Sequence, residues 1–255
     1  MTATLLEATG VSKHFGGVLA LDDVSIGVGE AEAVGLVGPN GAGKTTFFNC
    51  LLGLLRPDHG RVMFKGRDLT RLPIHRRARL GIGRTFQRVE LFAGLTVGEH
   101  LLIAERARRG RGGLLSDLVG GGRPTDEERE RVAETLELVG LGGAADVPVE
   151  ALSLGHARLL ELGRALITDP DLLLLDEPSS GLDRVEALAL AAVLKSTQEE
   201  RHTAVLLVEH DLVMVRRVVN RLFVLDFGSV LASGPVEEVL GDERVRHAYL
   251  GRGVA

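Results

Sequence analysis

Cysteine, tryptophan, tyrosine and lysine are scarce in this chain of 255 residues. It contains one cysteine, no tryptophan, one tyrosine and four lysines against 26 arginines. Because Cys50 stands alone, an intrachain disulfide and a cysteine-rich zinc site are both excluded. No run approaches the ~18 consecutive apolar residues that span a bilayer, and the first residues lack the basic-then-apolar pattern of a signal peptide. We therefore expect a cytoplasmic protein that does not itself cross a membrane.

Charge is unevenly distributed along the chain. The net charge is −5, yet residues 61–111 carry 13 arginines and lysines against four acidic residues. Such a segment suits a solvated arginine-rich face, or a surface facing nucleic acid, lipid headgroups or an acidic partner. The arginines at 106–111 alternate with glycine and have no aromatic neighbours, which disfavours a platform for stacking bases. We expect no nucleic-acid partner.

The most informative motif follows an apolar run at 33–37. It consists of Gly38, Pro39, Asn40, Gly41, Ala42, Gly43, Lys44, Thr45 and Thr46. The pattern G-x-x-x-x-G-K-T is typical of a loop whose backbone N–H groups surround phosphate oxygens at the start of a helix. Lys44 would reach the β- and γ-phosphates, and Thr45 would ligate Mg²⁺. The pattern predicts a nucleoside triphosphate site; the competing interpretation is a glycine-rich turn between strand and helix.

A second candidate site follows the leucine run at 172–175, where Asp176 and Glu177 come next. A buried strand that ends in adjacent carboxylates would deliver Asp176 to the Mg²⁺ shell and Glu177, as general base, to the attacking water. By itself such a pair is equally typical of a plain strand end. Glu161 and Glu209 are rival bases, but only Glu177 directly follows the expected metal ligand. We therefore predict Glu177 as the base, although nucleotide kinases and GTPases also have such phosphate loops.

The remaining apolar pattern predicts an α/β fold. We expect an antiparallel layer within 4–37, strands at 61–66, 82–86, 172–175, 204–208 and 222–225, and helices at 44–55, near 184–200, and from Thr125 onward with Val132, Leu136 and Val139 on one face. Apolar runs without alternation favour strands buried on both faces of a parallel sheet. The glycine-rich tract at 109–123 is a candidate mobile insertion.

Three further runs distinguish an ATPase from the nucleotide kinases and GTPases that also carry a phosphate loop. They are Leu152–His156, Ser179–Asp183 and Glu209–Asp211. With them, the chain resembles the ATP-binding subunits of ABC transporters over nearly its whole length. The resemblance implies a P-loop NTPase fold with a mostly parallel RecA-like sheet, an antiparallel β layer and an inserted helical subdomain. Its nucleotide-binding core would cover about 1–87 and 165–255, and the helical subdomain about 88–164.

The same resemblance implies roles for single residues. Phe15 would stack on adenine, Gln87 would sense Mg²⁺ and the attacking water, and His210 would contact the γ-phosphate. Ser153 and Gly155 match the signature motif, a helix tip that meets ATP bound to the opposite subunit. Each role has a structural alternative: a core aromatic for Phe15, a strand-end amide for Gln87, and a capping or solvent-facing imidazole for His210.

Four runs, at 15–21, 81–87, 91–97 and 238–251, look like the ATPases of branched-chain amino acid importers, and a long insertion after Leu102 suits the larger of that system's two ATPases. The implied partners are a second ATPase subunit, membrane-spanning permease subunits and an extracytoplasmic solute-binding protein, with this chain at the cytoplasmic face of the membrane. Leu154 and His156 depart from the broad signature pattern, which usually has glycine and glutamine there. A lipid or lipopolysaccharide exporter ATPase, an ABC ATPase acting on nucleic acid and a nucleotide kinase remain alternatives.

Overall fold

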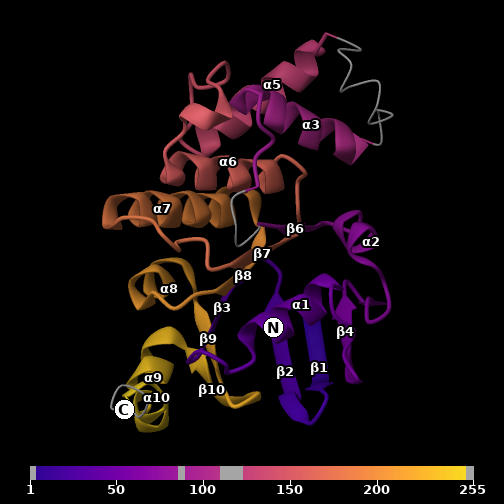
Figure 1. Cartoon of the computed structure of the whole chain (residues 1–255), viewed down its shortest axis with the longest axis vertical. Coiled ribbons are helices and arrows are strands. Elements are labelled where there is room, and N and C mark those ends of the chain that lie inside the picture. Colours follow the sequence, from indigo (N-terminus) through magenta and orange to yellow (C-terminus); the bar gives the residue numbers. More distant parts are fainter. Residues whose placement is uncertain (1–3, 86–89, 110–122, 251–255) are drawn as a thin grey trace.

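Two β-sheets and a set of covering helices make up the chain. The computed structural model describes residues 4–85, 90–109 and 123–250. One sheet has four strands in the order β2-β1-β4-β5, and the other has six in the order β10-β9-β3-β8-β7-β6. In Figure 1 the antiparallel strands lie at the lower right and helices α3, α5 and α6 at the upper end.

The four-stranded sheet is antiparallel and begins with a long hairpin. Strand β1 (Thr4–Phe15) pairs with β2 (Val18–Gly29) through a two-residue turn in which Gly16 has a φ of 57°. Strand β4 (His59–Phe64) then pairs with β1, and β5 (Arg67–Asp68) pairs with β4. The antiparallel layer expected within 4–37 is confirmed, but it is larger, because a distant segment completes it.

The six-stranded sheet forms the centre of the molecule. Its parallel strands are β3 (Ala33–Val37), β6 (Ile82–Arg84), β7 (Leu172–Asp176), β8 (Ala204–Val208) and β9 (Arg221–Asp226). All residues of β3, β7 and β8 are buried, as expected for strands covered on both faces. Strand β10 (Ser229–Pro235) pairs antiparallel with β9 at the edge, a strand that the sequence patterns did not predict.

Helices cover the parallel sheet. They are α1 (Lys44–Leu52), α2 (Ile74–Ala78), α7 (Arg184–Arg201), α8 (Leu212–Val218), α9 (Val236–Gly241) and α10 (Glu243–Leu250). The expected helix at 44–55 ends earlier, because Gly53 adopts a left-handed conformation with φ 80°. The buried Arg77 guanidinium donates to the carbonyls of Cys50 and Leu51, so it satisfies the free end of α1.

Three helices, α3 (Val97–Arg109), α5 (Asp126–Leu138) and α6 (Leu154–Leu166), pack together above α7 (Figure 1). A short 3-10 turn at Val149–Ala151 precedes α6. Helix α5 begins with a complete capping box between Thr125 and Glu128. Val132, Leu136 and Val139 are buried, which confirms the predicted apolar face. Most of the glycine-rich tract expected to be mobile lies outside the described residues.

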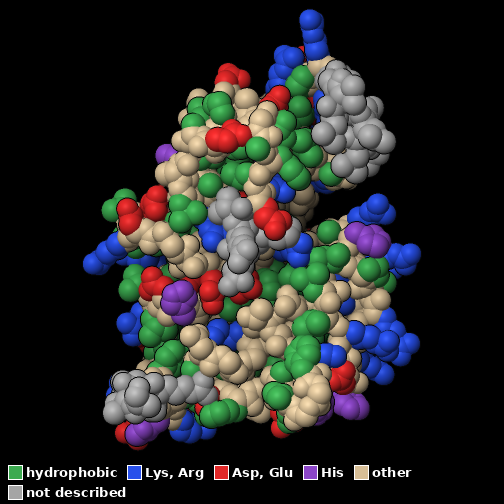
Figure 2. Space-filling view, viewed as in Figure 1, with side chains coloured by type: hydrophobic (Ala, Val, Ile, Leu, Met, Phe, Trp, Pro, Cys, Tyr) green, Lys and Arg blue, Asp and Glu red, His purple; other side chains and the backbone are tan. Residues whose placement is uncertain are grey.

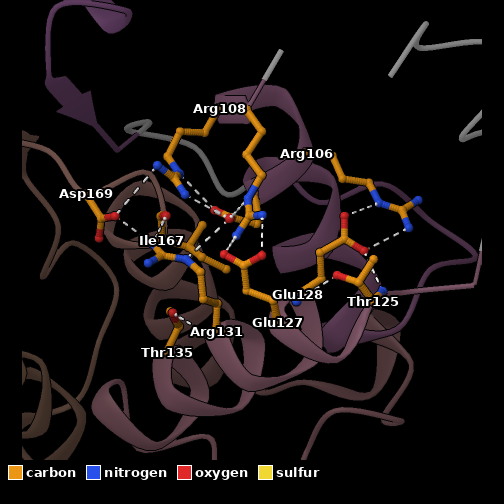
Figure 3. Close-up of polar contacts among 11 residues, drawn as sticks. Arg106, Arg108, Thr125, Glu127, Glu128, Arg131, Thr135, Ile167 and Asp169 are labelled. Atoms are coloured by element: carbon orange, nitrogen blue, oxygen red, sulfur yellow. Dashed lines mark hydrogen bonds and ion pairs between the residues drawn. The ribbon is translucent and has the colours of Figure 1, made fainter. Parts of the chain in front are cut away.

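Arginines of α3 form ion pairs within this helical region (Figure 3). The Glu105 carboxylate is fully buried and accepts hydrogen bonds from Arg108 and Arg109. Arg106 binds Glu128 with two nitrogens, at 3.0 and 3.2 Å. Part of the basic excess at 61–111 is therefore neutralised inside the protein and is not free to meet a polyanion.

Candidate active site

The phosphate loop connects β3 to α1 and owes its shape to two glycines. Gly38 has a φ of 152°, and a Cβ there would stand 2.2 Å from the Leu225 carbonyl oxygen. Gly43 has a φ of 102°, and its Cβ would stand 2.6 Å from the Ala20 carbonyl oxygen. Any other residue would clash with backbone at both positions, so glycine is a steric requirement of the loop.

The first turn of α1 is open to an anion. Gly43 precedes the helix without a side-chain cap, and no acidic residue occupies the first turn. The Lys44 ammonium donates to the carbonyl oxygens of Gly38 and Pro39, at 2.6 and 3.1 Å, and is thereby held inside the loop. Burial lowers the pKa of Lys44, although the charges of Glu177 and Asp176 oppose this. The uncapped amides and the lysine make a site for phosphate.

Asp176 and Glu177 stand at the end of β7, on the side of the sheet where Lys44 lies. Asp176 is 8% exposed, and burial together with the neighbouring Glu177 raises its pKa to about 6, against the influence of Lys44. Glu177 is half-buried, has a φ of 48°, and donates its backbone N–H to the Val208 carbonyl at 2.8 Å. The structure therefore brings the phosphate loop and both predicted carboxylates together.

These residues suit a magnesium ion. Burial is the main cause of the raised pKa of Asp176, but the charges of Glu177 and Glu209 raise it further while that of Lys44 lowers it, so an excess of negative charge surrounds this carboxylate. A divalent cation would relieve that excess and prefers oxygen ligands. Thr45, whose side chain is exposed at the start of α1, offers a hydroxyl oxygen. Gln87, the third predicted ligand, lies outside the described residues.

His210 lies in the connection after β8, next to Glu209, one of the rival bases considered from the sequence. The imidazole is 62% exposed, and its Nδ1 lies 3.7 Å from a carboxylate oxygen of Glu209. Glu209 is fully buried. In Figure 2 acidic side chains gather beside a histidine on this face, at the level of α8. The Glu209 carboxylate accepts hydrogen bonds from Ser179, in the loop after β7, and from the backbone of His210 and Asp211, in the loop after β8. No signal in the sequence indicated this arrangement, because the two loops are distant in the chain.

The signature residues form the tip of α6 and are already hydrogen-bonded within the chain. Ser153 caps this helix by accepting from the His156 backbone N–H at 3.2 Å. The Glu186 carboxylate of α7 accepts from the Ser153 hydroxyl at 3.4 Å and from the Gly155 N–H at 3.3 Å. Glu186 was not predicted from the sequence. Its carboxylate covers the same donors that the signature tip would offer to phosphate.

Two further candidates are clarified by their surroundings. Phe15 is 47% exposed at the end of β1, with the Lys13 ammonium 5.7 Å from its ring centre, so the interpretation as a core aromatic is wrong. Glu161 is buried, ion-paired with Arg158, and accepts the Glu90 backbone N–H. These contacts give Glu161 a structural role on α6 and remove it as a rival to Glu177.

A phosphate loop between a parallel strand and a helix, with paired carboxylates on the neighbouring part of the sheet, defines a P-loop nucleoside triphosphatase. Two family models match the chain. The one described as ABC transporter matches residues 21–180, and the one described as Branched-chain amino acid ATP-binding cassette transporter matches residues 229–255. The chain therefore belongs to the ABC transporter family, as an ATP-hydrolysing subunit, and the expected fold class is confirmed.

Relatives are similar over nearly the whole chain. The high-affinity branched-chain amino acid transport ATP-binding protein LivG of Salmonella typhimurium is 40% identical over 98% of this chain and 99% of its own length. The lipopolysaccharide export system ATP-binding protein LptB of Haemophilus influenzae is 34% identical over 97% and 98%. The structure of the ADP conformation of MJ1267, an ATP-binding cassette, has a TM-score of 0.85 at 33% identity and covers 98% of this chain and 100% of that one. Among the described residues, no helix has the length and apolar character for crossing a bilayer.

Proposed function

We propose that this chain powers the import of branched-chain or related amino acids. The observation that carries the proposal is the match of residues 229–255, which include β10, α9 and α10, to the model of branched-chain amino acid transporters. LptB, the relative that would favour lipopolysaccharide export, is less similar than LivG, at 34% against 40% identity. The chain would act at the cytoplasmic face of the membrane, with two permease subunits, a second ATPase and an extracytoplasmic solute-binding protein.

ATP would be held between two ATPase subunits. The uncapped start of α1 and Lys44 would bind its phosphates within one chain, while the signature motif of the second subunit approaches the γ-phosphate from the other side. Ser153 and Gly155 of this chain would do the same for ATP bound to the second subunit. The signature tip would belong to the helical subdomain expected at about 88–164. Both contacts use helix N-termini, whose amides and dipole favour anions.

Within this arrangement Glu177 would take the proton of the attacking water, His210 would contact the γ-phosphate, and Phe15 would stack on adenine. Thr45, Asp176 and Gln87 would hold Mg²⁺, which when bound neutralises charge on the phosphate oxygens. The half-buried position of Glu177 supports its role, because a base must reach solvent-derived water. Lys44 stays inside the loop and compensates negative charge on the transferred group.

The catalytic assignment is tested by Glu177→Gln. The amide preserves shape but cannot accept a proton, so turnover should fall by roughly 10²–10⁴-fold while ATP binding remains. Turnover is measured by phosphate release, and binding by titration with a fluorescent ATP analogue. The matched control is Glu200→Gln, which neutralises an exposed carboxylate on α7 and should leave turnover unchanged. Near-normal hydrolysis by Glu177→Gln would contradict the assignment.

The transport assignment is tested in the assembled system. The chain is reconstituted in vesicles with the permease subunits and second ATPase that co-purify with it, a candidate solute-binding protein is added, and uptake of radiolabelled leucine is followed. The proposal expects leucine-loaded binding protein to stimulate both ATP hydrolysis and uptake. Stimulation by lipopolysaccharide in place of leucine-loaded binding protein would favour the export alternative and overturn the proposal.

A further inference from the structure

Glu209 is a carboxylate buried in an unusual setting. It follows β8 directly and has no exposed surface. Among the described residues, the ion-pair neighbour of Glu209 is His210, whose Nδ1 lies 3.7 Å away and whose imidazole is charged only when protonated. Burying a carboxylate without a permanent counter-charge is costly unless hydrogen bonds satisfy both oxygens. The hydrogen bonds of Glu209 therefore indicate what the residue is there to hold.

Both oxygens of Glu209 are occupied by donors. One accepts from the Ser179 backbone N–H at 2.9 Å and from the Ser179 hydroxyl at 2.6 Å. The other accepts from the backbone N–H groups of His210 and Asp211, at 3.0 and 3.4 Å. Four donors on one side chain match a carboxylate, which offers acceptors only. A glutamine at this position would place its NH₂ group, a donor, against either the Ser179 donors or the His210 and Asp211 N–H groups, and would lose those hydrogen bonds.

These four bonds join two loops that carry proposed catalytic groups. Ser179 lies two residues after Glu177 in the connection from β7 to α7, and His210 lies in the connection from β8 to α8. The strands β7 and β8 are parallel neighbours, and Glu177 donates its backbone N–H to Val208. Pairing between the strands ends at this point, so the next link between the loops is the Glu209 side chain.

Glu209 itself cannot reach the reaction. It has no exposed surface, and both its oxygens already bind protein donors, whereas Glu177 is half-buried. We propose that Glu209 is a positioning residue that fixes the backbone of His210 relative to Glu177. This inference rests on the roles proposed above for those two residues. Displacement of a reacting group by about 1 Å can cost on the order of 10²-fold in rate.

The test compares Glu209→Gln with the native chain in steady-state ATP hydrolysis. The variant should lower kcat by about 10- to 100-fold, because His210 loses its fixed position, and leave KM for ATP within about twofold, because the phosphate loop is intact. The charge of Glu209 also raises the pKa of Asp176, so a second variant is needed to separate this electrostatic effect from the positioning of His210. Ser179→Ala removes one donor at constant charge and should lower kcat by a smaller factor in the same direction.

Combination with His210→Ala shows whether Glu209 acts through the histidine. Turnover of the His210→Ala chain is measured with radiolabelled ATP, and adding Glu209→Gln should not lower it further. A general structural defect would lower turnover by the same factor as in the native chain, and this result would overturn the inference. Native kcat in both Glu209→Gln and Ser179→Ala would also overturn it, as would a parallel loss of ATP affinity. If turnover of the double variant is below detection, the inference is judged from Glu209→Gln alone, by whether kcat falls while KM stays within about twofold. Native turnover in His210→Ala alone would instead overturn the role proposed above for His210, on which the inference rests.

Discussion

We propose that two helix tips of the chain bind phosphate, and their surroundings differ. The tip of α1 has no side-chain cap and no acidic residue in its first turn, and Lys44 is held in place by the carbonyls of Gly38 and Pro39. The tip of α6 is capped by Ser153 and covered by the Glu186 carboxylate. The tip of α1 is therefore open to an anion in the single chain, whereas the tip of α6 would have to exchange internal hydrogen bonds for phosphate.

The largest effect is expected at the open tip. Lys44→Ala removes a charged donor from the phosphate loop and should weaken ATP binding to the isolated chain by roughly 10- to 100-fold. Titration with a fluorescent ATP analogue measures this. Lys195→Ala, an exposed lysine on α7, is the control and should bind as the native chain does. Equal affinities of Lys44→Ala and the control would show that α1 is not the main phosphate site.

At the covered tip, Ser153→Ala should lower ATP turnover by about tenfold while leaving ATP affinity of the isolated chain unchanged. Loss of the helix cap also costs about 1 kcal/mol of stability. Thr125→Ala is a matched control, because it removes an equivalent cap from α5 at the same first-turn position. A drop in turnover of equal size in both variants would mean that only helix stability is being measured.

A smaller effect is expected from Glu186→Gln. The amide keeps the first-turn contact with Asp183 but removes the negative charge that competes with phosphate at Ser153 and Gly155. The ATP concentration for half-maximal turnover should fall by about two- to fivefold. Glu200→Gln on the same helix controls for net charge. A rise in that concentration would mean that Glu186 supports the signature tip and does not compete with its ligand.

The smallest effect is expected at Asp58, which binds the end of β1 next to Phe15. Hydrogen bonds from Lys13 and the His14 backbone hold the pKa of Asp58 at about 2, well below its usual range, and Lys13 also lies over Phe15. A lowered pKa stabilises the fold above pH 4, and this contribution is lost as the pH falls toward 2. Asp58→Asn should therefore lower Tm by about 1–2 °C at pH 7. Tm curves that stay apart down to pH 2 would contradict this.

Features encoded in continuous stretches were predictable from the sequence. The phosphate loop, the carboxylates after β7 and the buried strands each lie in one run, so spacing alone indicates them. Strand β10 was missed because its pairing with β9 at the sheet edge leaves it only partly buried and without a clear pattern. Glu186 and Glu209 could not be assigned roles, because their partners lie some 30 residues away in the chain.

Other roles depend on groups outside the single chain and leave no signal in its linear sequence. Phe15 and His210 are exposed, and their roles depend on a bound nucleotide. Ser153 makes its contacts to His156 and Glu186, while Lys44 makes its contacts within the phosphate loop. Nothing in a linear pattern states whether two such tips meet in one subunit or across two.

The most direct measurement is the structure of the Glu177→Gln chain, with its partner ATPase, bound to ATP and Mg²⁺. We expect the γ-phosphate to lie between Lys44 of one subunit and a signature serine of the other. Wherever Ser153 of this chain binds a phosphate, we expect the Glu186 carboxylate to have withdrawn from it. A triphosphate bound by Lys44 while Ser153 still contacts Glu186, with no second subunit at the phosphate, would contradict binding between two subunits.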